Sequence, residues 1–186
     1  AWASPRLASL AWASPRLARS LGFAGSRYSG GVQGPLGIVI VDHGSRRAES
    51  NRLFERFVEL FCASSEHEIV ELAHMELAEP GIETALLRCV ERGARRVLVA
   101  PYFLAPGRHW AGDLSTQAAA AAEKASALIE DEVSWLVGQP IGLHPAMVTI
   151  IEERIGACLA HARGDSEGCE ACAGTDRCQF RTGTSS

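Results

Sequence analysis

Three histidines lie just beyond apolar runs that are typical of buried β-strands. Each follows a different run: His43 after residues 36–41, His74 after residues 68–73, and His109 after residues 96–103. The carboxyl ends of parallel strands meet at one edge of an α/β sheet, where ligands bind, so we expect all three imidazoles at that edge. Neutral imidazole binds divalent metals and takes up protons near neutral pH. Two histidines facing a cleft could therefore hold an ion, transfer protons or do both; the alternative is three unrelated loop histidines.

Acidic and basic side chains accompany the histidines. Glu76 and Glu79 could act as bases at the same edge, or could only cap a helix that begins near Pro80. Guanidinium groups bind carboxylates through paired hydrogen bonds, so a cleft beside arginines would suit a ligand with several carboxylates. The neighbouring arginines are Arg46, Arg47 and Arg108. No Gly-x-Ser-x-Gly turn or phosphate-binding glycine loop is present, which argues against acyl and phosphoryl transfer.

Apolar side chains in the same loops could provide flat surface for a large planar ligand. They are Met75, Phe103, Leu104 and Trp110. Each of these residues taken alone is more typical of a hydrophobic core than of a ligand wall. Only their coincidence with the histidines suggests a binding site.

The elements that must position these residues alternate along the chain. Apolar, β-branched runs predict strands at residues 36–41, 68–73, 96–103 and 133–137. Helical patterns, capped in one case by Asp113, predict helices at residues 49–61, 80–92, 113–130 and 146–161. This order predicts one α/β domain over residues 35–162, with a parallel sheet of about four strands and helices on both faces in flavodoxin-like layering.

Composition limits the classes of function. The 186 residues carry a formal net charge of −4, which argues against a general nucleic-acid surface. No apolar run approaches the roughly 20 residues that a membrane-spanning helix needs. Residues 1–34 contain four arginines and no acidic residue, and repeat one octet at 1–8 and 11–18. An Arg-rich, Ser-rich and acid-free segment predicts an organelle transit peptide; the alternative is a disordered, low-complexity extension.

Cysteines cluster in a polar tail over residues 163–186. Cys169, Cys172 and Cys178 lie within ten residues, and Cys158 precedes them. Four thiolates can hold zinc or an iron–sulfur cluster, and the spacing alone does not choose between them. Cys89 could replace Cys158 as the fourth ligand. Cys62 is expected to be an ordinary buried thiol.

Three motifs carry a resemblance to a known family. They are Asp-His-Gly-Ser-Arg-Arg-x-Glu-Ser-Asn at residues 42–51, Ala-His-Met-Glu-Leu-Ala-Glu-Pro at 73–80 and Pro-Tyr-Phe-Leu-x-Pro-Gly-Arg-His-Trp at 101–110. Together and in this order they resemble the sirohydrochlorin ferrochelatases of the short, single-domain plant and algal class, which are class II chelatases. The resemblance covers residues 36–180.

This resemblance implies a lyase-type enzyme that inserts Fe2+ into sirohydrochlorin and releases two protons to give sirohaem. It implies that His43 and His109 form the metal site, where one binds the incoming iron and one or both accept the pyrrole protons. Glu76 or Glu79 could assist as base or iron relay, and the macrocycle contacts further residues. The residues expected to bind the substrate are Ser45, Arg46, Arg47, Met75, Phe103 and Arg108. The alternatives are a cobaltochelatase acting on the same macrocycle and a non-catalytic carrier of tetrapyrrole or metal.

The resemblance also bears on cofactor, assembly and location. It favours a 2Fe-2S cluster over zinc at Cys158, Cys169, Cys172 and Cys178. A short-class chain has one lobe where longer relatives have two, so a homodimer that encloses the substrate is expected. Composition alone does not separate plastid from mitochondrial transit peptides. The resemblance to the plant enzymes makes the chloroplast stroma the expected location.

Overall fold

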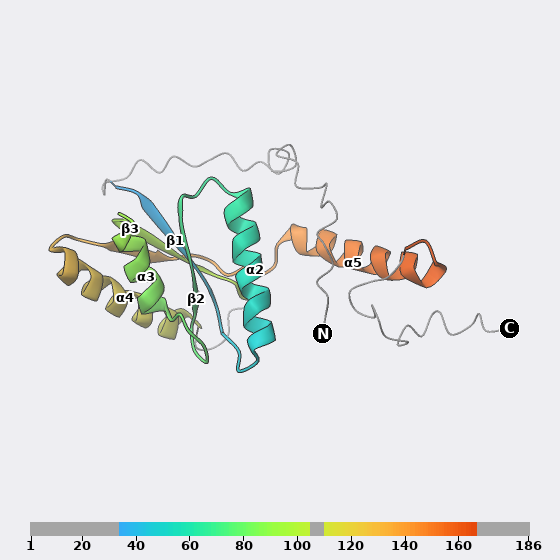
Figure 1. The fold of residues 1–186 in the computed structure, drawn as a ribbon, viewed down its shortest axis with the longest axis horizontal. Helices are drawn as coiled ribbons and strands as arrows, with labels where there is room; N and C mark the ends of the chain where they lie inside the picture. The colour runs from blue at the N-terminus through green and yellow to red at the C-terminus, as the bar shows by residue number, and fades with distance from the viewer. Residues whose placement is uncertain (1–33, 105–109, 167–186) are drawn as a thin grey trace, which may run out of the picture. The chain divides into compact units, whose positions relative to one another are not determined.

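A computed structural model of the chain describes residues 34–104 and 110–166. Strands and helices alternate along them, as Figure 1 shows. The elements are β1 (Leu36–Asp42), α2 (Ala48–Ser64), β2 (Ile69–His74), α3 (Ile82–Glu91), β3 (Arg96–Pro101), α4 (Trp110–Ile129), β4 (Ser134–Val137) and α5 (Pro145–Arg163). The strands form one parallel sheet in the order β2-β1-β3-β4. The predicted α/β class, with a four-stranded parallel sheet between helices, is therefore confirmed.

β1 lies inside the sheet and is apolar on both faces. Successive side chains of a strand point to opposite faces. Accordingly, Val39 and Val41 belong to the core on one face, and Ile38 and Ile40 to the core on the other. Such a strand has no polar side to expose to water, which explains why its sequence is continuously apolar.

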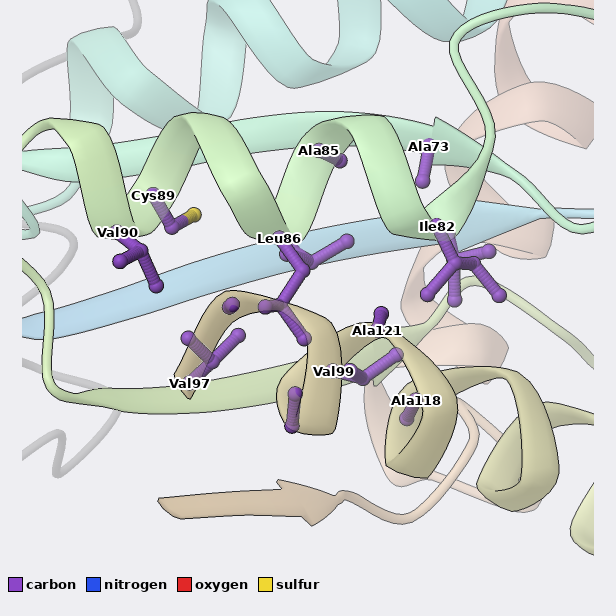
Figure 2. Packing of buried hydrophobic residues seen from close by; sticks show 14 of the residues in the cluster. Ala73, Ile82, Ala85, Leu86, Cys89, Val90, Val97, Val99, Ala118 and Ala121 are labelled. Atoms are coloured by element: carbon purple, nitrogen blue, oxygen red, sulfur yellow. The ribbon is translucent and has the colours of Figure 1, made fainter. Parts of the chain in front are cut away.

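Helices cover both faces of the sheet. α2 places Phe54 and Val58 against Ile38, Ile40 and Val70 on one face. On the other face, α3 and α4 pack on the sheet and on each other, and Figure 2 shows Leu86 of α3 close to Ala121 of α4 and Val97 of β3. The alanines of α4 let the two helices approach closely, because a methyl group fills little space between them. They are Ala118, Ala121, Ala122 and Ala125.

β1 also approaches α3 closely at Gly37. A Cβ atom added there would lie 2.8 Å from Cys89 Cβ and 3.1 Å from Ala94 Cβ. Gly37 is buried, and the Cys89 side chain of α3 occupies the space that a larger residue at 37 would need. This glycine is therefore required by packing rather than by an unusual backbone angle.

Groups from outside the sheet occupy parts of the outer edge of β2. Arg92, at the end of α3, donates from Nη1 to Val70 O at 3.1 Å and to Glu71 Oε1 at 2.7 Å. Its Nη2 donates to Glu68 O at 2.5 Å. At the other end of the strand, the His74 backbone N–H donates to Pro80 O at 2.8 Å. Backbone groups at both ends of this edge are thus already paired, namely Val70 O and His74 N.

Some predicted boundaries differ from the structure. α3 begins at Ile82 and its N-cap is Gly81, so Pro80 precedes the helix instead of opening it. Asp113 lies in the first turn of α4, which begins at Trp110, so this acid is not the N-cap. Both helices were predicted at the right place, and only their starts were wrong.

The chain divides into two compact units between Ile141 and Gly142. The second unit contains α5, whose N-cap His144 accepts a hydrogen bond at Nδ1 from the Ala146 N–H, and whose C-cap Gly164 has a left-handed φ of 85°. The proposed boundaries at 1–34, 35–162 and 163–186 stay predictions. Within the described ranges, the helices are too short or too polar to cross a bilayer.

Candidate active site

The ends of β1 and β2 remain paired beyond the sheet. Asp42 stands opposite His74 in the parallel register. Past that pair, Met75 N donates to Asp42 O at 2.8 Å and Glu76 N donates to His43 O at 3.2 Å. These bonds place the backbones of His43 and Glu76 side by side at the carboxyl edge. The sequence-based expectation that these two residues meet at one edge is supported by this geometry.

Gly44 makes the close approach of the two strand ends possible. Its φ is +73°, a conformation that side-chain-bearing residues adopt at a cost. A Cβ at this position would lie 2.6 Å from Glu76 O and 3.0 Å from His74 Cβ. Both the backbone angle and the packing therefore require glycine directly after His43.

The His43 side chain is exposed, and its ring lies against Phe103. The two ring centroids are 4.5 Å apart and the planes are tilted by 33°. Phe103 follows β3 and is itself buried with 6% of its surface exposed. β3 is held next to β1 at this end by a hydrogen bond from Tyr102 N to Val41 O at 2.7 Å. Three strand ends thus contribute to the surroundings of one solvent-accessible imidazole.

The two predicted carboxylates have different environments. Glu79 Oε2 accepts a hydrogen bond at 2.9 Å from the backbone N–H of Gly81, the residue that precedes α3. Glu76 is exposed and lines an open depression of about 430 Å³ that is formed by the segment from His74 to Gly81. Both carboxylates are accessible, and Glu76 is the one whose backbone is paired with that of His43.

Ser45 and its neighbours shape the start of α2. Ser45 Oγ accepts a hydrogen bond from Arg47 N at 3.0 Å, and Ser45 O accepts one from Asn51 Nδ2 at 2.9 Å. The side chains of Arg46 and Arg47 are exposed next to His43 in sequence. Arg108 and His109 lie outside the described residues, so the predicted partner of His43 is not placed. Among the residues that are placed, no three His, Cys, Asp or Glu side chains are grouped as a metal site.

His74 does not present its ring to solvent as His43 does. It is 1% exposed, and its Nδ1 lies 2.5 Å from Asp42 Oδ1. Sequence patterns placed His74 at the correct edge but did not indicate this contact, because it depends on the register that sets Asp42 opposite His74. The position of each residue directly after its apolar run was the available indication. Met75 is also buried, with 6% of its surface exposed in the main core.

The described cysteines have contrasting environments. Cys158 lies half-buried on α5, whereas Cys169, Cys172 and Cys178 lie outside the described residues. Cys62 is exposed, so the expectation of a buried thiol was wrong. Cys89 is buried against β1, and desolvation, followed by the nearby Glu71 carboxylate, raises the pKa of its thiol to about 12 although Arg92 opposes the shift. A metal ligand must ionise, so this burial argues against Cys89 as a replacement for Cys158.

Comparison with known proteins finds relatives for the region that contains this site. The CbiX family model matches residues 37–158. A chloroplastic sirohydrochlorin ferrochelatase from Arabidopsis thaliana is 46% identical over 150 residues, which cover 81% of this chain and 64% of the Arabidopsis protein. The chain therefore spans less than two thirds of the length of that relative.

Two solved structures share the architecture. A CbiX protein from Marinobacter aquaeolei superposes with a TM-score of 0.55 at 31% identity, over 68% of this chain and 99% of that one. The sirohydrochlorin chelatase SirB from Bacillus subtilis, in complex with cobalt, superposes with a TM-score of 0.55 at 29% identity, over 70% of this chain and 50% of SirB. At these identities the likeness extends beyond the general fold class.

Proposed function

Because the chain belongs to the CbiX family, we propose that it is a lyase-type metal chelatase that inserts Fe2+ into sirohydrochlorin to give sirohaem. The observation that carries this proposal is the junction of β1 and β2, where the exposed His43 stands beside the accessible Glu76. The 46% identity to the Arabidopsis ferrochelatase supports iron as the metal and sirohydrochlorin as the macrocycle.

The reaction exchanges two pyrrole N–H protons for one divalent cation. It therefore needs a ligand that delivers the metal and a base that accepts protons. In this proposal His43 and His109 bind the incoming iron and accept protons as the pyrrole nitrogens take over as ligands. Phe103 lies against the His43 ring at a centroid distance of 4.5 Å, which restricts rotation of the ring and so the direction in which its nitrogen lone pairs point. Glu76 assists as base or passes iron to His43.

The macrocycle carries many carboxylates around an apolar ring. Exposed arginines at the start of α2 can bind these carboxylates through paired hydrogen bonds. The proposed substrate-binding residues are Ser45, Arg46, Arg47, Met75, Phe103 and Arg108. The burial of Met75 and Phe103 supports a role in shaping the floor of the site rather than in broad contact with the ring.

A cobaltochelatase is the second candidate. Imidazole accepts both ions, and Co²⁺ binds nitrogen ligands more tightly than Fe2+ in general. The likeness to SirB in complex with cobalt favours keeping this alternative. A non-catalytic carrier of tetrapyrrole or metal would use the same residues, and differs only in the absence of rate acceleration.

A 2Fe-2S cluster, a homodimer and a chloroplast location complete the proposal. Cys158, Cys169, Cys172 and Cys178 are the proposed cluster ligands, and zinc is the alternative metal. The chloroplastic relative supports a plastid location, for which we propose the stroma.

The cluster assignment is tested by analysis of iron and sulfide. Protein purified without oxygen is expected to contain two iron and two sulfide per chain, and Cys172→Ala is expected to lose both while retaining most chelatase activity. Stoichiometric zinc without sulfide would overturn the cluster assignment.

The decisive experiment is an anaerobic assay with purified protein, sirohydrochlorin and Fe2+, followed by visible absorption against a control without protein. Rapid conversion is expected, and His43→Ala or His109→Ala should reduce kcat by about 100-fold or more, because each removes a metal ligand and a base. His67→Ala is the matched control, because His67 is exposed, stacks on Phe61 of α2, and precedes β2 at the end of the strand pair opposite to His43.

Other outcomes decide between the alternatives. Tight binding of sirohydrochlorin without acceleration would support the carrier. Faster insertion of Co²⁺ than of Fe2+ under the same conditions would support the cobaltochelatase. Conversion that is insensitive to both histidine substitutions would contradict the assigned site.

A further inference from the structure

We propose that Asp42 and His74 act as a positioning pair that holds His43 in place for metal insertion. The inference rests on the proposed chelatase function and assigns a role to two residues that do not themselves bind iron. Asp42 ends β1 and His74 ends β2, 32 residues later. Because β1 and β2 are paired in register, the two side chains meet where the strands leave the sheet.

One carboxylate oxygen makes both essential contacts. Asp42 Oδ1 lies 2.5 Å from His74 Nδ1 and accepts a hydrogen bond from Gly44 N at 2.8 Å. His43 is the residue between Asp42 and Gly44. The bond from Gly44 therefore fixes the chain just after His43, while the bond from His74 fixes the carboxylate itself to the neighbouring strand.

The surroundings of His74 make this arrangement rigid. Its ring is buried, and the ring of Phe54 on α2 lies 5.7 Å away at an angle of 51°. A carboxylate accepts hydrogen bonds, so Nδ1 is the donor in the contact between His74 and Asp42. Within the described residues, Nε2 is buried and has no hydrogen-bond partner. Among these residues, Nδ1 is therefore the ring nitrogen through which His74 bonds to the protein.

The geometry of His43 depends on these contacts. His43 O also accepts a hydrogen bond from Glu76 N at 3.2 Å, and its ring rests on Phe103. Asp42 and His74 thus hold the backbone on both sides of His43. They also hold the start of the segment that carries Glu76, which follows His74. Ligands are effective only when their supporting residues fix them within fractions of an ångström.

Two substitutions of the same histidine separate a positioning role from a general structural one. His74→Leu fills the site with an apolar side chain of similar size, which cannot donate a hydrogen bond to Asp42. His74→Asn places an amide N–H near the position of Nδ1 and so can restore the bond. We expect kcat for iron insertion to fall by about 10- to 100-fold in H74L, the usual loss when a residue that supports a metal ligand is removed, and H74N to recover most of it.

Two readouts make the test specific. KM for sirohydrochlorin should change little in either variant, because in this proposal neither Asp42 nor His74 contacts the macrocycle. Co²⁺ added without macrocycle should bind H74L more weakly than wild type, with a changed visible spectrum, and H74N should again resemble wild type. His67→Leu is the matched control for loss of an exposed histidine and should leave both readouts unchanged.

Each outcome bears on one of the two proposals. Wild-type protein without chelatase activity would refute the proposed function, and the Co²⁺ comparison would still test the pair. Equal kcat and equal Co²⁺ binding in wild type, H74L and H74N would overturn the proposed role of the pair. The same conclusion would follow if H74L and H74N both fold and lose kcat and Co²⁺ affinity to the same extent. If H74L does not fold, Asp42→Asn replaces it: a weaker, uncharged acceptor should lower kcat and alter the Co²⁺ spectrum, and unchanged values would overturn the inference.

Discussion

Cys89 illustrates how burial alone determines the chemistry of a single side chain. Its Sγ lies 3.9 Å from Ile38 O on β1, and the residue is fully buried. Desolvation is the main cause that raises the pKa of this thiol, from 9.0 to about 12. Cys62, on α2, is exposed and shows no such burial. The two thiols therefore differ in accessibility although the sequence gives no indication of it.

This pKa shift predicts a loss of stability at high pH. Above pH 9 the thiol of Cys89 ionises in the unfolded chain but not in the folded one, so the contribution to stability is complete below pH 9 and is lost as the pH approaches 12. The free energy of unfolding should fall by about 1.4 kcal/mol per pH unit in this window from Cys89 alone. Urea unfolding at pH 8, 9 and 10 under reducing conditions measures it.

Two cysteine variants provide the control. Cys89→Ala should lack this part of the pH dependence, so its stability relative to wild type should improve as the pH rises. Cys62→Ala should keep the wild-type slope. Parallel slopes for wild type and C89A would show that the Cys89 thiol ionises equally well in both states.

At the scale of elements, Gly37 of β1 sets how closely α3 can pack. Gly37→Ala would bring a methyl group within 2.8 Å of Cys89 Cβ, and neither element can move without disturbing the core. We expect the free energy of unfolding to fall by about 1–3 kcal/mol, as for other overpacked cores. Gly112→Ala in α4 is the control, because no atom of the described residues lies within 4 Å of the new methyl group.

The control should change stability in the opposite direction. Alanine favours a helix over glycine by about 0.5–1 kcal/mol, so Gly112→Ala should raise the urea midpoint. A G37A protein as stable as wild type would mean that Cys89 or α3 can shift without cost, and would contradict the close packing seen at this position.

The elements themselves were largely predictable from sequence. Apolar runs gave all four strands because each strand lies in one parallel sheet, and β1 is buried on both faces. The starts of α3 and α4 were not predictable. The N-cap of α3 is Gly81, whose N–H bonds to Glu79, and α4 begins three residues before Asp113. Pattern alone does not show which of several polar residues will cap a helix.

One part of the candidate site, the meeting of two strand ends, was predictable from sequence. Strand ends indicated that His43 and Glu76 meet, because parallel strands share one carboxyl edge. The burial of His74 and its bond to Asp42 could not be predicted, because they require the register of β1 and β2 and the position of Phe54 on α2. Specific contacts between side chains follow from three-dimensional packing, which local patterns do not contain.

At the scale of the whole molecule, Arg92 joins the end of α3 to the outer edge of β2. It donates to two backbone carbonyls and pairs with Glu71. Arg92→Leu should lower the free energy of unfolding by about 1–3 kcal/mol, because a carbonyl left without a donor loses its compensation for desolvation. Urea unfolding and light scattering would detect the loss of stability and any aggregation.

A substitution on the same helix controls for charge. Arg88 is exposed in the last turn of α3, and Arg88→Leu should change stability by about 0.5 kcal/mol or less, as most surface substitutions do. Equal effects of R92L and R88L would indicate that loss of positive charge, rather than loss of the bonds to β2, is responsible.

The pairing at the edge of β2 restricts how two copies of the chain can associate. Adding a strand from a second copy along β2 would require displacing the guanidinium of Arg92 at one end and Pro80 O at the other. A continuous intermolecular sheet through this edge is therefore disfavoured. Where the proposed homodimer uses the β2 side of the sheet, it must form through side-chain contacts, so its affinity there is expected to respond to substitutions of exposed residues.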